Sequence, residues 1–167
     1  KLPESRGKAG LFSGWSELPN VEVIPVRSVL GGRSDRSGAP FLERDTHWTP
    51  GGMEAVAGRI AALAGAPPAD DAKFLEVPVS GEGDLTRMLE LPEGALFARQ
   101  TVVTRKRPGS AEDEGGGEPP DLLLLGDSFS AIYSEKVLGW GGGAGLIDVL
   151  EDRYGLKVQS FINHGDP

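Results

Sequence analysis

Apolar residues recur along the chain at spacings that predict several helices. The clearest run places its apolar residues three or four positions apart, at Met53, Val56, Ile60 and Leu63. Thr49 suits the N-cap of this helix, Pro50 suits its first position, and Gly65 ends the pattern. The same spacing predicts further helices at 84–91, 128–138 and 146–154.

Runs rich in β-branched and other apolar residues predict five strands, at 21–26, 74–79, 96–106, 121–125 and 156–162. The run at 121–125 is continuously apolar and ends at Gly126, which suits a central strand of a parallel sheet covered on both faces. Strands alternate with helices over most of the chain. We therefore predict an α/β fold with a mostly parallel central sheet.

The length of the chain bounds its domain organisation. With 167 residues and 38% hydrophobic residues it suits one domain with a real core. The abrupt start and end lead us to expect one domain over 1–167 that is a fragment of a longer protein. Residues 108–120 include Glu-Asp-Glu-Gly-Gly-Gly-Glu, and this composition predicts a flexible acidic loop.

Composition narrows the partners and the chemistry. The formal net charge of −8 argues against nucleic acid, whose phosphates require a basic surface. The absence of cysteine excludes thiolate catalysis, disulfides and cysteine-ligated zinc. The glycines at 141–145 lack the lysine and spacing of a phosphate-binding P-loop, so a flexible rim is the better interpretation. No metal and no cofactor is predicted.

Ser128 is the candidate nucleophile. It follows the apolar strand and the Gly126-Asp127 turn and begins a predicted helix, so it should lie at the carboxyl edge of the sheet. Unpaired amides at a helix start can stabilise an oxyanion, which favours attack on an ester carbonyl. The alternative is that Asp127 or Ser128 only caps the helix.

A serine hydroxyl needs a base that titrates near neutrality, and the chain has two histidines. Asp45 precedes His47 by two residues, so on extended chain both side chains point to one side and the carboxylate can orient the imidazole. His164 has a possible partner in Asp166 and stays an alternative, although the intervening glycine loosens their geometry. We favour His47.

Two motifs in this order, Asp45-Thr-His-Trp-Thr-Pro-Gly and Gly126-Asp-Ser-Phe-Ser, resemble the SGNH-hydrolase-like domain of the alginate O-acetyltransferase family. In that family the Asp-x-His pair precedes the serine, a permuted order relative to ordinary SGNH esterases. The resemblance implies a three-layer SGNH-hydrolase-like fold, with Ser128 as nucleophile, His47 as base and Asp45 as orienting acid. It also implies an oxyanion hole that includes the Ser128 amide.

Three further residues are candidates for the oxyanion hole or the substrate site, namely Asp127, Asn163 and Trp48. Asn163 follows the last strand, where an amide can face the serine edge, although an asparagine after a strand is more often simply a turn residue. Trp48 can wall the pocket beside His47.

The resemblance further implies acetyl transfer to a hydroxyl of an exported polysaccharide, through an acetyl-serine intermediate, in the periplasm or elsewhere in the cell envelope. The acetyl donor would be supplied by a membrane-bound O-acyltransferase. A carbohydrate acetyl esterase with the same triad is the first alternative. A non-catalytic polysaccharide-binding domain is the second, with Trp15, Trp48 and Trp140 as stacking platforms.

Overall fold

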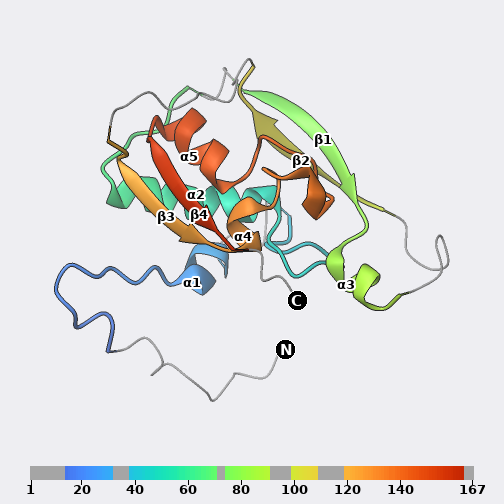
Figure 1. Cartoon of the computed structure of the whole chain (residues 1–167), viewed down its shortest axis with the longest axis horizontal. Coiled ribbons are helices and arrows are strands. Elements are labelled where there is room, and N and C mark those ends of the chain that lie inside the picture. The colour runs from blue at the N-terminus through green and yellow to red at the C-terminus, as the bar shows by residue number, and fades with distance from the viewer. Residues whose placement is uncertain (1–13, 32–37, 71–73, 91–98, 109–118, 164–167) are drawn as a thin grey trace.

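The computed structural model describes residues 14–31, 38–70, 74–90, 99–108 and 119–163. Helices α2 (Pro50–Leu63) and α5 (Leu146–Tyr154) pack against each other (Figure 1). Strands β1 (Leu75–Gly81) and β2 (Gln100–Lys106) form an antiparallel pair. Strands β3 (Leu122–Gly126) and β4 (Val158–Ile162) form a parallel pair. Because α5 contacts both β2 and β4, it joins the two sheets through one core.

The predicted helix after Thr49 is confirmed. The Thr49 hydroxyl accepts a hydrogen bond from the Gly52 amide, and Pro50 occupies the first position of α2, where its missing N–H costs nothing. Met53 and Val56 lie on the buried face of α2. The cap therefore fixes where α2 begins, only three residues after His47.

Four of the five predicted strands are confirmed, and the one at 21–26 is wrong. Residues 96–98 of the strand predicted at 96–106 lie outside the described residues, and β2 confirms the rest of it. Residues 21–25 form neither helix nor strand, and helix α1 (Val26–Gly31) follows directly. A strand needs a neighbour for its main-chain hydrogen bonds, and no other described segment pairs with this one. The Ser28 hydroxyl instead donates to the Pro25 carbonyl, which turns the chain into α1.

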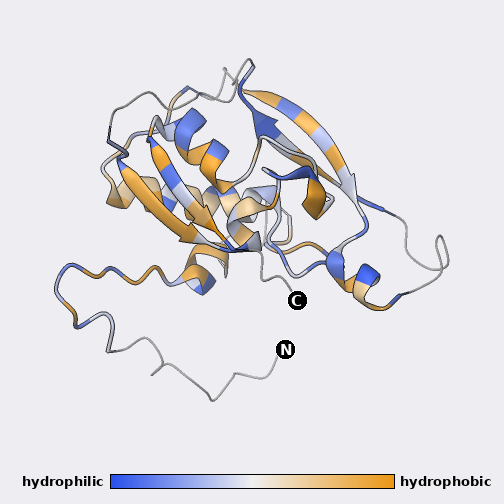
Figure 2. Cartoon of the chain, in the orientation of Figure 1, coloured by the Kyte–Doolittle hydropathy of each residue, from blue (hydrophilic) through white to orange (hydrophobic). Residues whose placement is uncertain are grey.

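The strand that precedes Ser128 is present but is not covered on both faces. Leu123 and Leu125 of β3 are 56% and 73% exposed, and Phe161 of β4 is 59% exposed. Figure 2 shows β3 as hydrophobic along its whole length. One face of β3 packs on the core. The other face is also apolar, and no described residue covers it, so the continuous apolar run does not mark a strand covered on both faces.

The predicted helix over 128–138 is interrupted. Helix α4 (Ser128–Ala131) is followed by Ile132 in an extended conformation and by Tyr133 at φ 71°, and a 3-10 helix spans Lys136–Leu138. Ile132 and Tyr133 are fully buried. The break lets both side chains enter the core, a gain that local helix propensity does not include.

The remaining predictions concern a short helix and two loops. Helix α3 (Asp84–Met88) confirms the short helix predicted there. The glycine-rich loop at 141–145 is anchored rather than a free rim, because Ala144 is buried and its amide donates to the Tyr133 carbonyl. Most of the predicted acidic loop at 108–120 lies outside the described residues. None of the described helices is both long and apolar enough to cross a membrane.

Candidate active site

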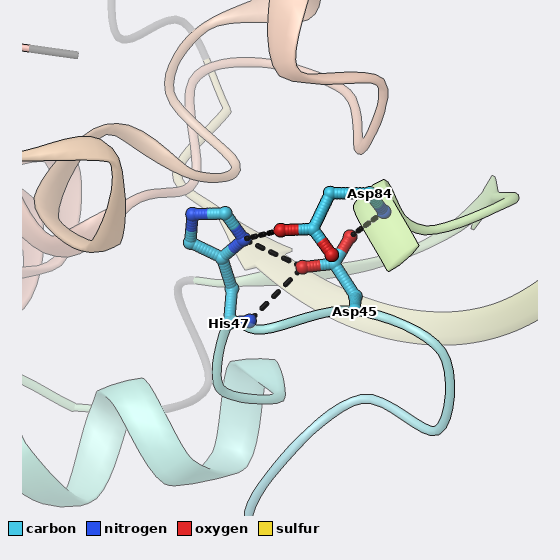
Figure 3. Close-up of side chains that lie close together, drawn as sticks. All are labelled: Asp45, His47 and Asp84. Atoms are coloured by element: carbon cyan, nitrogen blue, oxygen red, sulfur yellow. Dashed lines mark hydrogen bonds and ion pairs between the residues drawn. The ribbon is translucent and has the colours of Figure 1, made fainter. Parts of the chain in front are cut away.

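Asp45 and His47 form a buried acid–base pair on the loop before α2 (Figure 3). The imidazole Nδ1 lies 2.5 Å from Asp45 Oδ1, and the His47 amide donates to the same oxygen over 3.0 Å. Both residues are more than nine-tenths buried. The two-residue spacing therefore brings the side chains together as predicted, and Asp45 fixes the tautomer with the proton on Nδ1.

The second oxygen of Asp45 is held by two more donors. Trp140 Nε1 donates to Oδ2 over 2.8 Å, and the Asp84 amide donates to it over 3.0 Å. Burial alone raises the pKa of Asp45, but the hydrogen bonds from His47, Trp140 and Asp84 outweigh it and hold the pKa at about 2. Asp45 is therefore an anion at neutral pH.

Asp84, the first residue of α3, completes the cluster. Its carboxylate accepts from the Thr46 amide over 2.8 Å and also from the Thr46 hydroxyl. Its Oδ2 lies 3.7 Å from His47 Nδ1. In Figure 3 the Asp84 carboxylate faces the imidazole from the α3 side, and Asp45 reaches it from the loop. Two carboxylates thus face one ring nitrogen.

The cluster of Asp45, His47 and Asp84 has the residue types of a metal site. Each Asp45 oxygen, however, already accepts two hydrogen bonds, and His47 Nδ1 donates to one of them. A metal ion would have to displace these donors, so the arrangement favours a hydrogen-bonded acid–base pair.

Ser128 begins α4 at the carboxyl end of β3, as predicted. Asp127 is the N-cap, and its carboxylate accepts from the Phe129 amide over 3.0 Å. The capping alternative is therefore confirmed for Asp127 and not for Ser128. A Cβ at Gly126 would lie 2.3 Å from Ser130 Oγ, so glycine is needed for α4 to fold back on β3.

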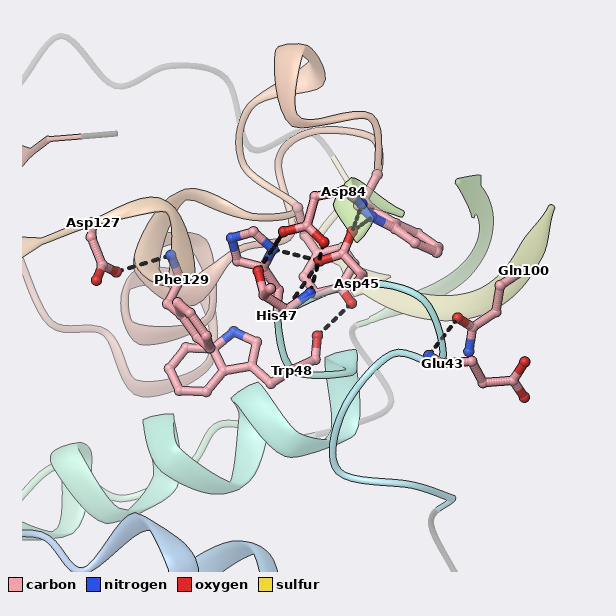
Figure 4. A network of polar contacts seen from close by, with 11 residues as sticks. Glu43, Asp45, His47, Trp48, Asp84, Gln100, Asp127 and Phe129 are labelled. Carbon is pink, nitrogen blue, oxygen red and sulfur yellow. Dashed lines mark hydrogen bonds and ion pairs between the residues drawn. The ribbon is translucent and has the colours of Figure 1, made fainter. Parts of the chain in front are cut away.

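The serine turn meets the histidine segment through aromatic side chains (Figure 4). The Phe129 ring lies 4.8 Å from the His47 ring and 5.4 Å from Trp48, which it meets edge-on. His47 Nε2 is buried and has no hydrogen-bond partner among the described residues, Ser128 Oγ included. Ser128 and His47 therefore come from adjoining segments, with the nitrogen needed for a general base unoccupied.

The other candidates differ in their placement. Asn163 is at the serine edge, because its main-chain amide donates to the Gly126 carbonyl over 3.0 Å. Its role in the oxyanion hole stays a prediction. His164 and Asp166 lie outside the described residues, so the choice between the two histidines stays a prediction. Trp48 and Trp140 are 8% and 2% exposed, too little for either to stack on a sugar ring. Trp15 is exposed.

Sequence reasoning missed Asp84, and it considered Trp140 only as a stacking platform, not as a partner of Asp45. The only local signal for Asp84 was its position after Gly83 at the start of a predicted helix. Trp140 adjoins Gly139 in a loop and carries no motif. They reach Asp45 across 39 and 95 residues, so only the folded chain reveals them.

Comparison with known proteins places this chain in a family. A family model described as "SGNH hydrolase-like domain, acetyltransferase AlgX" matches residues 16–139. The chain is 25% identical to the probable alginate O-acetylase AlgJ of Azotobacter vinelandii, over 93% of this chain and 46% of the relative. The solved O-acetyltransferase domain of Pseudomonas putida AlgJ superposes with a TM-score of 0.62 at 23% identity, over 92% of this chain and 52% of that one.

These matches agree on the fold, and the matched relatives are longer than this sequence. The chain spans about half the length of the relatives it matches. Because the family model covers more than half of the chain, the predicted resemblance and the predicted SGNH-hydrolase-like α/β fold are confirmed. The described strands nevertheless form two separate pairs, one antiparallel and one parallel, and not the predicted mostly parallel central sheet. The chain belongs to the family of SGNH hydrolase-like acetyltransferase domains typified by AlgX.

Proposed function

We propose that this chain is the catalytic domain of a serine-dependent O-acetyltransferase that acts on an exported polysaccharide. The observation that carries the proposal is the buried Asp45–His47 pair, whose free Nε2 lies beside the turn that presents Ser128. An ionised acid, an oriented imidazole and a serine at a sheet edge are the parts that acyl transfer requires.

In the proposed reaction His47 Nε2 takes the Ser128 proton while Ser128 Oγ attacks the acetyl carbonyl. The tetrahedral intermediate collapses, the donor oxygen leaves with the proton from His47, and acetyl-serine remains. A sugar hydroxyl then gives its proton to His47 and attacks the acetyl group. Collapse of the second intermediate returns the proton to Ser128 and releases the acetylated sugar.

Asp45 serves both steps through His47. Its charge stabilises the imidazolium that forms each time Nε2 accepts a proton, and its hydrogen bond keeps Nε2 directed away from the acid. The Ser128 amide is the first donor proposed for the oxyanion, and Asn163 at the same edge is the second. The Phe129 amide is an unsuitable donor because Asp127 already occupies it.

The substrate assignment rests on the relatives. One is named an alginate O-acetylase and another an O-acetyltransferase domain, so a polysaccharide hydroxyl is the proposed acceptor. We further propose that the domain spans residues 1–167 of a longer protein, that it acts in the periplasm, and that a membrane-bound acyltransferase supplies the acetyl groups.

Intact mass after incubation with p-nitrophenyl acetate tests the covalent step. Wild type should gain one acetyl group and Ser128→Ala none. Ser130→Ala is the matched control, since Ser130 lies in the same motif but is not assigned to the chemistry. Absence of label in wild type, or labelling of Ser128→Ala, would contradict the proposal and favour a binding domain.

Two further comparisons refine the assignment. His47→Ala should abolish labelling, whereas His164→Ala should retain it, and the reverse result would make His164 the base. Acetyl transfer to oligosaccharides should then exceed release of free acetate. Release of acetate alone, at the same rate with and without oligosaccharide, would make the protein an esterase instead.

A further inference from the structure

Asp84 contacts every residue of the Asp45-Thr46-His47 segment. Its amide holds Asp45 Oδ2 over 3.0 Å, its carboxylate accepts from the Thr46 amide over 2.8 Å, and its Oδ2 lies 3.7 Å from His47 Nδ1. Asp84 and this segment bind each other reciprocally. The main-chain amide of Asp84 donates to the Asp45 side chain, and the Asp84 side chain accepts from the main-chain amide of Thr46.

The backbone is shaped for this contact. Gly83 has φ 85°, and a Cβ there would lie only 2.0 Å from the Arg44 carbonyl oxygen. The Leu85 amide donates to that same oxygen over 3.2 Å. The start of α3 is therefore pressed against the loop that carries His47, which brings the Asp84 carboxylate close to the imidazole.

The burial of the cluster makes the charge of Asp84 effective. The side chain of His47 is 9% exposed and that of Asp84 is 22% exposed. Charges a few ångströms apart interact more strongly in such surroundings than in water, because little solvent screens them. A negative charge near Nδ1 is placed to stabilise the imidazolium that forms when His47 takes the serine proton in the proposed reaction.

We propose that Asp84 is a second acid of the site: a positioning residue that holds the Asp45–His47 segment and whose charge stabilises the imidazolium alongside Asp45. The inference rests on the proposed function, in which His47 acts as the base. It goes beyond a Ser-His-Asp triad by assigning two carboxylates to the same ring nitrogen.

Asp84→Asn separates the charge from the scaffold. The carboxamide oxygen can still accept from the Thr46 amide, and the main-chain bond to Asp45 is untouched. We expect kcat for acetyl transfer to fall at least tenfold or so, with KM within about twofold, because the lost interaction belongs to the transition state. Glu76→Gln, which removes an exposed charge on β1, should retain the wild-type kcat.

Asp84→Ala completes the series, because it also removes the Thr46 contacts. If only Asp84→Ala loses activity and Asp84→Asn retains the wild-type kcat, Asp84 acts as scaffold alone and the proposal is overturned. Thermal unfolding midpoints should match between Asp84→Asn and Glu76→Gln. A folded Asp84→Asn with a reduced kcat supports the charge role.

A readout independent of activity distinguishes this inference from the proposed function. The Nδ1 proton of His47, assigned by NMR in a His164→Gln background, should shift in Asp84→Asn and stay in place in Glu76→Gln. An unmoved resonance would overturn the role of Asp84, even in an active enzyme. If wild type is never acetylated but the resonance shifts as expected, the catalytic proposal fails while the contact between Asp84 and the imidazole stands.

Discussion

The Tyr133 hydroxyl donates a hydrogen bond to the main-chain carbonyl of Trp48 over 2.8 Å, although 85 residues separate the two. Trp48 directly follows His47, and Tyr133 lies two residues after α4, the helix that Ser128 begins. Burial, and then the charge of Asp45, raise the pKa of Tyr133, so the phenol keeps its proton. This bond sets the serine turn relative to the histidine segment.

Tyr133→Phe should both destabilise the protein and slow acetylation. The Trp48 carbonyl would lose its buried donor, at a cost of about 1–3 kcal/mol in the free energy of unfolding. The rate of acetyl labelling at Ser128 should fall because the two segments lose a direct tie. Urea unfolding and labelling rates measure the two effects. Tyr154→Phe, at the other tyrosine, is the control and should change neither by as much; equal behaviour of the two variants would refute the assigned role.

Asp45 should make stability depend on acidity. Its pKa is 3.8 without perturbation and about 2 in the folded protein, so folding favours the ionised form. The resulting stabilisation, about 2 kcal/mol, is complete above about pH 4 and is lost as the pH falls toward 2. Asp45→Asn lacks the ionisable group. The gap in unfolding free energy between wild type and Asp45→Asn, from urea curves, should therefore narrow over this window, and a constant gap would contradict the lowered pKa.

Gly83→Ala should damage the site more than its backbone angle alone explains. The new methyl group would lie 2.0 Å from the Arg44 carbonyl, so α3 would have to move away from the His47 loop. Gly65→Ala is the matched control, with φ 72° and open space around the added atom. We expect the free energy of unfolding to fall by about 1 kcal/mol in Gly65→Ala and by clearly more in Gly83→Ala. Similar unfolding midpoints for the two variants would show that the close contact is unimportant.

The sequence allowed prediction of those parts of the fold that local patterns control. Helix α2 was predictable because Thr49 and Pro50 determine its start and apolar spacing determines its buried face. The Asp45–His47 contact was predictable because the two residues are close in the chain. The position of Ser128 at a sheet edge followed from a strand, a turn and a helix in succession.

What could not be predicted depends on distant contacts. The run at 21–26 has strand composition, but a strand exists only where another strand is available to pair with it. Helix α4 ends early because Ile132 and Tyr133 gain more from burial than from continuing the helix. Trp140 reaches Asp45 from a loop and Asp84 reaches it from the start of α3, and no local pattern predicts these contacts.

The long separations within the site also affect when it forms. The contacts from Trp140 to Asp45 and from Tyr133 to Trp48 close loops of 95 and 85 residues. The entropy of closing loops of this length must be lost before the contacts contribute, and such non-local contacts slow folding. We therefore expect Asp45, His47 and Ser128 to come together late in folding, after the local helices have formed. We accordingly expect a nascent chain to complete the contacts around Asp45 only after residues beyond Trp140 have been synthesised and have joined the core.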